Sequence, residues 1–271
     1  MSKVILDKEA CIKCNICVES CPYSIIGLDK SSFPELSQEG EAVCNFCGAC
    51  EAFCPKSAIT LDFQLQEEKQ SYKASINEEQ ISSYLKARRS VRRFKDIAVE
   101  KEKLERLMET VRYAPTGMNL QQVKWIMIYD TNELRKLTGL AVDWMRALAN
   151  SDSPVKEAFR AELIVKAWES GIDNICRSAP HLLIACTPTD GMASSNDGII
   201  ALSYFDAALP AFGLGGFWAG FFTVASMNWQ ALQSALQIPE GYKVSYAIAF
   251  GYPKYTVHNI PRRNPLSISW R

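Results

Sequence analysis

The chain has 271 residues, of which 48% are hydrophobic, and its 30 basic residues balance its 30 acidic residues. This length and composition can fill one or two hydrophobic cores, which excludes an intrinsically disordered protein. The balanced charge argues against a general affinity for nucleic acid or for an anionic membrane surface. The first residues, MSKVILDKEAC, lack the apolar core of a secretory signal, so we expect a cytoplasmic protein.

Eight of the ten cysteines form two copies of one pattern, C-x2-C-x2-C-x3-C-P, near the start of the chain. Thiolates at this spacing bind [4Fe–4S] clusters, and the fourth cysteine of each run ligates the other cluster. The pattern therefore predicts two clusters with crossed ligand sets. The sets are Cys11, Cys14, Cys17 and Cys54 for one cluster, and Cys44, Cys47, Cys50 and Cys21 for the other.

The repeat extends beyond the cysteines, because CPYSIIGLD and CPKSAITLD match at several positions and imply two related halves. Disulfides would need an oxidising compartment, and zinc ribbons use two separated cysteine pairs. Residues 1–63 resemble bacterial two-cluster ferredoxins. The stretch between Cys21 and Cys44, which contains DKSSFPELSQEGEAV, is predicted to be an extended loop.

Residues 64–80 are polar, lack apolar periodicity and are predicted to be a linker. Residues 81–271 are predicted to form a second domain. Its expected helices are 81–90, 99–114, 132–150 capped by Asn132, 154–171, 196–216 and 228–238. Its expected strands are 123–130, 181–188, 217–225 and 242–253. The order of elements lacks regular alternation and so favours an α+β fold.

The segment from Pro210 to Met227 has no charged residue, but Pro210 and four glycines interrupt it. We expect a buried core helix and strand here rather than a membrane span.

Three polar motifs interrupt this scaffold. ARRSVRRF supplies Arg88, Arg89, Ser90 and Arg92, either as a phosphate cradle or as a solvated helix face. APTGMNLQ carries amides just before a strand, where they could read a planar ligand or form an ordinary turn. GLGGFWAG lacks the dinucleotide-binding fingerprint, because Trp218 stands where the third glycine is needed.

Together with GYP at Gly251 and PRRNP at Pro261, these motifs resemble the nitroreductase family over residues 81–271. The resemblance implies an α+β homodimer, with a mixed sheet flanked by helices and FMN bound at the subunit interface. It implies that the backbone of Gly220 and Phe221 lies near flavin N5. The FMN contacts carried over by motif are Arg88, Arg89, Ser90, Arg92, Asn119, Gln121, Gly220, Phe221, Arg262 and Arg263.

The chain also departs from that family. Gln122 and Val123 intervene before Trp125, where the family often has proline, and residues 144–174 match nothing assigned. The C-terminal PLSISWR is expected to cross onto a partner subunit.

Four other residues could carry chemistry but have simpler explanations. Cys176 and Cys186 adjoin apolar runs and are expected in the core. His181 is expected to be a half-buried residue with its hydrogen bonds satisfied, and His258 to lie in a surface loop. Tyr113 is a guess for a proton donor.

The two halves together predict an oxidoreductase. An external low-potential donor protein would reduce the clusters, and FMN would convert single electrons into pairs for a small electrophilic acceptor. Nitroaromatics, quinones and activated alkenes fit that description, and we expect poor NAD(P)H activity. Two alternatives stay open: an electron-transfer module for a partner redox protein, and an enzyme that oxidises its substrate and discharges electrons through the clusters.

Overall fold

The computed structural model describes residues 3–62, 72–73, 75–191 and 195–271. The chain divides into two compact units, one comprising Met1–Lys73 with Met118–Leu120 and the other Ala74–Gly117 with Gln121–Arg271. Of the predicted linker 64–80, residues 64–71 and 74 lie outside the described residues, and its last three residues, 78–80, belong to a helix.

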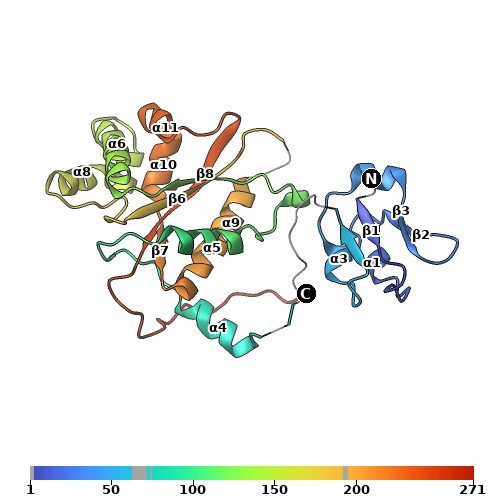
Figure 1. Cartoon of the computed structure of the whole chain (residues 1–271). Helices are drawn as coiled ribbons and strands as arrows, with labels where there is room; N and C mark the ends of the chain where they lie inside the picture. The colour runs from blue at the N-terminus through green and yellow to red at the C-terminus, as the bar shows by residue number, and fades with distance from the viewer. Residues whose placement is uncertain (1–2, 63–71, 74, 192–194) are drawn as a thin grey trace. The chain divides into compact units, whose positions relative to one another are not determined.

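The first unit is built from short elements that form two antiparallel ribbons (Figure 1). Its strands are β1 (Val4–Leu6), β2 (Ile26–Leu28), β3 (Pro34–Leu36) and β4 (Ile59–Leu61), and its helices are α1 (Ile16–Glu19), α2 (Gln38–Val43) and α3 (Ala49–Ala52). Strand β1 pairs with β4, and β2 pairs with β3. A few residues, including Ile59 and Leu61, form a small core together with Cys17 and Cys50.

The sequence repeat is also a repeat in the backbone. Helices α1 and α3 occupy matching places, because each begins one residue before the third cysteine of its copy. Left-handed φ angles recur at matching positions: Lys13, Asn15 and Ser24 in the first copy, and Phe46, Gly48 and Ser57 in the second. The two halves therefore bend the chain in the same way around their cysteines.

The extended loop predicted between the two copies is wrong. This stretch contains β3, which pairs with β2, and α2, which begins after Ser37. The Ser37 hydroxyl accepts a hydrogen bond of 3.0 Å from the Gly40 N–H, a serine cap that starts a helix even in a polar sequence.

The second unit is an α+β domain, as predicted. Its strands are β5 (Lys124–Ile128), β6 (His181–Pro188), β7 (Gly215–Trp218) and β8 (Tyr242–Gly251). Its helices are α4 (Glu78–Ala87), α5 (Lys101–Val111), α6 (Thr131–Ala149), α7 (Val155–Phe159), α8 (Ala161–Glu169), α9 (Ser195–Ala208), η2 (Leu209–Phe212), α10 (Gly220–Asn228) and α11 (Gln230–Leu236). A short 3-10 turn, η1, spans Gly117–Asn119.

The four strands lie in the order β5-β6-β8-β7, and the three pairings between described residues are all antiparallel. Within the described residues the sheet is therefore antiparallel, whereas a mixed sheet was expected. Strands β6 and β7 run in the same direction, but β8 lies between them, so each adjacent pair is antiparallel.

The sheet is buried on both faces. Along β6, Leu182 and Ile184 contact one core, whereas Leu183 and Ala185 contact the other. Helices α6, α8, α10 and α11 cover the first face, and α5 and α9 cover the second (Figure 1). Apolar residues at every position of this central strand are what a sheet between two helical layers requires.

Several predicted helix boundaries need correction. Helix 154–171 is two helices, because Arg160 between α7 and α8 takes a left-handed φ of 52°. The cap of α6 is Asp130 rather than Asn132, since the Asp130 carboxylate accepts a hydrogen bond from the Glu133 N–H at 2.7 Å. Helix α4 stops at Ala87, so the arginine-rich motif that follows is extended rather than helical.

The apolar segment after Asp206 also differs from the prediction. The helix ends at Ala208, Pro210 lies in η2, and Gly213 turns the chain with a left-handed φ of 71°. The expected strand 217–225 is β7 followed by helix α10. The segment contributes buried residues to both cores. Among the described residues, no helix has the length and apolar character needed to cross a membrane.

Candidate functional site

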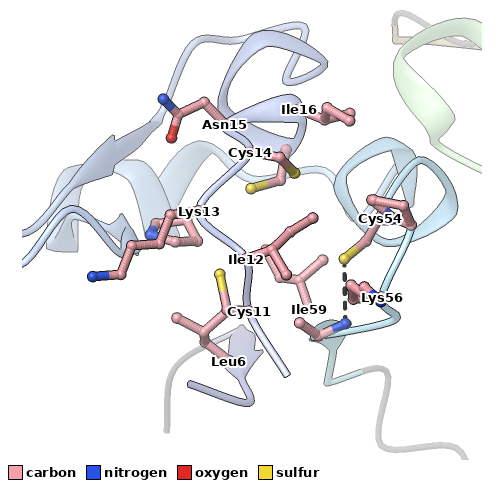
Figure 2. A pocket seen from close by; sticks show the side chains of 14 residues that line it. Leu6, Cys11, Ile12, Lys13, Cys14, Asn15, Ile16, Cys54, Lys56 and Ile59 are labelled. Atoms are coloured by element: carbon pink, nitrogen blue, oxygen red, sulfur yellow. Dashed lines mark hydrogen bonds between the residues drawn. The ribbon is translucent and has the colours of Figure 1, made fainter. Parts of the chain in front are cut away.

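The first unit contains a cavity surrounded by four cysteines from separate parts of the chain. Cys11, Cys14 and Cys17 come from the first copy of the motif, and Cys54 comes from the end of the second. Figure 2 shows the sulfur atoms of Cys11, Cys14 and Cys54 on different sides of this space. The Cys54 sulfur accepts a hydrogen bond of 3.2 Å from the Ala58 N–H, the kind of contact that stabilises a thiolate ligand.

A second cavity repeats this arrangement with the other four cysteines of the motif. Cys44, Cys47 and Cys50 line it together with Cys21, which arrives from the first copy. The structure therefore brings together the two crossed sets that the spacing predicts. The remaining lining is mostly apolar and includes Ile26 and Leu36, which would shield a cluster from water.

Burial disfavours the thiolate form of the two most buried cysteines of the repeat as long as no cation lies beside them. Burial, together with the neighbouring Cys47, Cys21 and Cys44, raises the pKa of Cys50 to about 11. Burial also raises the pKa of Cys17. Four thiolates this close need a positively charged partner, and the iron of a cubane supplies it.

In the second unit, the arginine-rich motif lies along the edge strand β7. The Val91 N–H donates a hydrogen bond of 2.9 Å to the Gly216 carbonyl. This close approach requires Gly215, because a Cβ built there would lie 2.4 Å from Val91 Cγ2. Gly215 thus allows the motif to lie close against the strand.

Arg88 is the most enclosed cation of this motif. Its Nη1 lies 3.3 Å from Asp206 Oδ2, and the same oxygen accepts a hydrogen bond of 3.1 Å from Trp218 Nε1. Arg88 Nη1 is buried and makes no hydrogen bond of good geometry within the described part of the chain. This nitrogen is already ion-paired with Asp206, but a guanidinium carries further N–H groups that can donate to an anion such as a phosphate. Burial raises the pKa of Asp206, while Trp218 and Arg88 oppose the rise.

The other members of the motif point in different directions. Arg89 donates to the carbonyls of Lys86 and Ala87, where α4 ends, and Ser90 is half-buried. The Arg92 guanidinium lies 5.7 Å from the centre of the Phe217 ring. The motif therefore offers a partly buried cation, Arg88, before Ser90 and an exposed cation, Arg92, after it.

Arg92 is one of the residues that line a cavity of about 440 Å³. This volume is within the range of small-molecule sites. Gly220 and Phe221, predicted to lie near the reactive atom of a flavin, line the same cavity. The other lining residues are Phe159, Asn174, Ile175, Arg177, Phe217, Trp218 and Val224. Flat aromatic walls beside arginines suit a flavin ring and its acceptor.

The two amides predicted to face a flavin have other contacts. Asn119 is grouped with the first unit, and its Nδ2 donates to the carbonyls of Asn45 and Phe46, each at 3.0 Å. Gln121 is exposed, and its N–H donates to Thr116 Oγ1 at 3.0 Å. Gly117, at the start of this turn, is held by the buried Asp197, which accepts its N–H at 3.1 Å.

Arg262 and Arg263 lie in an exposed C-terminal segment without regular secondary structure. His258 is exposed in the same segment, as predicted. Tyr113 is 66% exposed.

Cys176 and Cys186 are core residues, as predicted, and burial raises the pKa of Cys186 to about 11. His181 is more buried than expected. Its Nδ1 donates to the Tyr129 carbonyl at 2.8 Å, and its Nε2 accepts from the Val99 N–H at 2.9 Å.

Sequence reasoning missed Asp206, Asn174 and Arg177. Asp206 lies in a helix read only as apolar. The other two lie in or beside the segment 144–174, which resembled nothing assigned. Arg177 stands between two apolar pairs, Ile175–Cys176 and Ala179–Pro180. A charged residue in such a position is the sequence signal that could have indicated it.

Comparison with known proteins separates the same two parts of the chain. A ferredoxin from Pyrobaculum islandicum is 36% identical over 58 residues, which are 21% of this chain and 51% of the ferredoxin. The chain thus spans about half the length of that relative. A protein of Archaeoglobus fulgidus with the provisional name NADH dehydrogenase/NAD(P)H nitroreductase is 22% identical over 62% of this chain and 82% of its own.

A solved structure gives the same result for the fold. The FMN-bound nitroreductase from Bacteroides fragilis superposes with a TM-score of 0.57 and 21% identity, over 72% of this chain and all of its own. This supports the nitroreductase fold of the second unit.

Two family models account for most of the sequence. Residues 10–59 match the 4Fe-4S dicluster domain, which confirms the prediction of a two-cluster ferredoxin domain. Residues 85–252 match the nitroreductase family. The chain therefore belongs to the nitroreductase family and carries a 4Fe-4S dicluster domain ahead of its nitroreductase domain.

Proposed function

We propose that this protein is a ferredoxin-fused FMN oxidoreductase that passes electrons from two [4Fe–4S] clusters to FMN and on to a small electrophilic acceptor. One observation carries the proposal. A single chain holds two cavities with four cysteines each, together with a third cavity lined by Arg92, Gly220 and Phe221. FMN supplies the step between one-electron and two-electron chemistry when it is bound.

The residues of the chain bind and orient rather than react. Arg88, Arg89 and Ser90 would hold the phosphate, and the ion pair with Asp206 would keep the Arg88 guanidinium in place. Arg92 would contact the ring system, and the backbone of Gly220 and Phe221 would lie beside it along the same cavity. Arg262 or Arg263 would add a second phosphate contact, and Asn119 and Gln121 remain proposed ring contacts.

We further propose a homodimer. The C-terminal segment exposes Leu266 by 83% and Trp270 by 88%, and exposed apolar residues in an extended segment favour coverage by another chain. A second copy is the partner that the family resemblance implies. The second phosphate contact, Arg262 or Arg263, would then lie in the same segment that reaches the other subunit.

The electron source is proposed to be a low-potential donor protein. The dicluster domain supports this direction, because clusters accept single electrons from other proteins. The Archaeoglobus relative is named for NAD(P)H, so direct hydride transfer from a nicotinamide is the second candidate. The outcome of a turnover assay with NADH and with a photoreduced donor separates the two.

The test is anaerobic spectroscopy of the full chain. The proposal expects about eight irons and about one FMN per chain. After photoreduction, addition of a nitroaromatic should reoxidise flavin and clusters together at a rate that matches turnover. The proposal fails if the protein retains no FMN after reconstitution. It also fails if the flavin is reoxidised while the clusters stay reduced, and an electron-transfer module is favoured if turnover requires a partner protein.

A further inference from the structure

A loop that precedes β6 places an arginine in the cavity beside Gly220 and Phe221. Asp173 builds this loop: one carboxylate oxygen accepts the N–H groups of Ile175 and Cys176 at 2.8 Å, and the other accepts that of Ser178 at 2.8 Å. Ile175 and Cys176 are each only 1% exposed and anchor the loop in the core. Arg177 follows directly, so its backbone position is fixed by buried neighbours.

The backbone of this loop is unusual at the point where the arginine leaves it. Arg177 and Ser178 both have left-handed φ angles, 58° and 53°. Such angles cost energy in residues other than glycine and persist where the surroundings enforce them. Arg177 Nη1 donates to Asn174 Oδ1 at 2.7 Å, and this bond fixes the guanidinium as well as the backbone. The Arg177 guanidinium is therefore held in place by Asn174.

The charge around Arg177 is unbalanced. The cavity is lined by two arginines, Arg92 and Arg177, and none of its lining residues is acidic. Burial lowers the pKa of Arg177, the positive charge of Arg92 and Arg93 lowers it further, and Asp173 opposes the shift. The oxygens of Asp173 are occupied by backbone N–H groups. A cavity with this balance attracts an anion.

The other walls of the cavity are apolar and mostly aromatic. Phe159 and Phe221 have ring centres 5.8 Å apart, and Phe217 and Trp218 complete the lining from β7. The proposed phosphate contacts of the cofactor lie on the motif Arg88–Arg92, whereas Arg177 belongs to a different loop. Its charge is therefore available to a second ligand.

We propose that Arg177 is a specificity-determining residue and that the acceptor is an aromatic or conjugated carboxylate. The carboxylate pairs with the Arg177 guanidinium, Asn174 orients that guanidinium, and the planar part lies between the aromatic walls near Gly220 and Phe221. This inference rests on the proposed function, because it takes these two residues to mark the reactive side of the flavin.

The test compares two molecules of nearly equal size, 4-nitrobenzoate and 4-nitrobenzamide, which differ in charge. In the turnover assay the nitro group takes two electrons and two protons to give a nitroso group and water, with dithionite as the electron source. The ratio of kcat/KM for the carboxylate to that for the amide is measured for the wild type, Arg177→Gln and Arg177→Lys. Arg93→Gln removes the same charge from an exposed neighbour outside the cavity lining and is the matched control.

The expected result is a preference of the wild type for the carboxylate. Arg177→Gln should lower the ratio about 10- to 100-fold, the loss typical of a charge-assisted hydrogen bond. Arg177→Lys should retain part of it, and Arg93→Gln should leave the ratio within about twofold. Binding of both compounds to the oxidised protein, measured by calorimetry, should show the same pattern in Kd without turnover.

Three results would overturn the inference. One is an unchanged ratio in Arg177→Gln, another is an equal drop in Arg93→Gln, and the third is a loss of FMN content in Arg177→Gln with the ratio preserved, which would make Arg177 a cofactor contact. The FMN content of the wild type, measured separately, distinguishes these results from a failure of the proposed function.

Discussion

Gly215 offers a sharp test of how the arginine-rich motif is held. In the structure the motif lies against β7, and a Cβ at residue 215 would lie 2.4 Å from Val91 Cγ2 and 3.0 Å from Val91 Cβ. Carbon atoms in contact lie about 3.5–4.0 Å apart, so Gly215→Ala must move one segment by about 1 Å. Valine cannot relieve the contact by turning its side chain, because its Cβ is also too close.

The cost has two parts. Overpacking at a close contact costs about 1–3 kcal/mol, and the hydrogen bond from the Val91 N–H to the Gly216 carbonyl adds about 1 kcal/mol if the motif shifts away. We expect the free energy of unfolding of the second unit to fall by about 2–4 kcal/mol. Because the motif carries Arg88 and Arg92, FMN affinity should fall at least about tenfold.

Urea unfolding can follow the second unit selectively. All six tryptophans lie between residues 125 and 270, so their fluorescence reports on this unit alone. FMN affinity is measured by titrating the flavin-free protein. Two controls accompany the variant: Val91→Ala with Gly215→Ala, and Gly139→Ala within α6, where the new Cβ would meet Trp168 at an ordinary 3.8 Å.

The double variant should recover part of the lost stability and FMN affinity, because removal of the two Val91 methyl groups abolishes the 2.4 Å contact but leaves the 3.0 Å contact with the Cβ of residue 91. Gly139→Ala should stabilise the protein by about 0.5–1 kcal/mol, since alanine is favoured over glycine inside a helix. The reasoning is refuted if Gly215→Ala unfolds at the same urea concentration as the wild type. It is also refuted if Val91→Ala fails to relieve the defect.

Three other outcomes follow from buried groups. Cys54→Ser should lose about four of the eight irons and Cys186→Ser none, as iron analysis would show; equal losses would contradict the ligand role of Cys54. Burial lowers the pKa of His181, so the stability it contributes is present above the unfolded pKa of about 6.5 and is lost as the pH falls below it. Urea midpoints between pH 7.5 and 5 should therefore fall more steeply in the wild type than in His181→Asn. Asp206→Ala should cost about 2–4 kcal/mol in unfolding free energy by leaving Arg88 and Trp218 without their shared oxygen. Asp206→Asn should cost less, because it keeps an acceptor, and an equal cost would argue against this role.

The sequence alone determined the domain type of the first unit and the grouping of its cysteines, but not the strand and helix between the two copies. Each set of thiols is fixed by spacings of two and three residues, and only the fourth ligand comes from the other copy. At such separations the backbone has few alternatives, so the pattern specifies the geometry. The same holds for the long amphipathic or apolar elements α5, α6, β6 and β8, whose periodicity is a local property.

Local signals were weaker where a glycine or proline interrupts an apolar run. Helix α9 and strand β7 were predicted with shifted boundaries because the run from Ile199 to Ala225 is mostly apolar and does not distinguish helix from strand. Pro210 and Gly213 mark the true break, and Gly215 belongs to β7 because only a residue without Cβ fits beneath Val91. That constraint comes from a contact across more than a hundred residues.

Only the tertiary structure decided how the cavity of the second unit is composed. It joins Arg92, Arg177 and Gly220, which come from three separate segments, and it gives Arg88 a buried partner in Asp206 on α9. No spacing rule relates residues so far apart, because their proximity depends on how helices pack on both faces of the sheet. The grouping of the cysteines therefore follows from local spacing, whereas the charge and shape of the proposed acceptor site arise from packing.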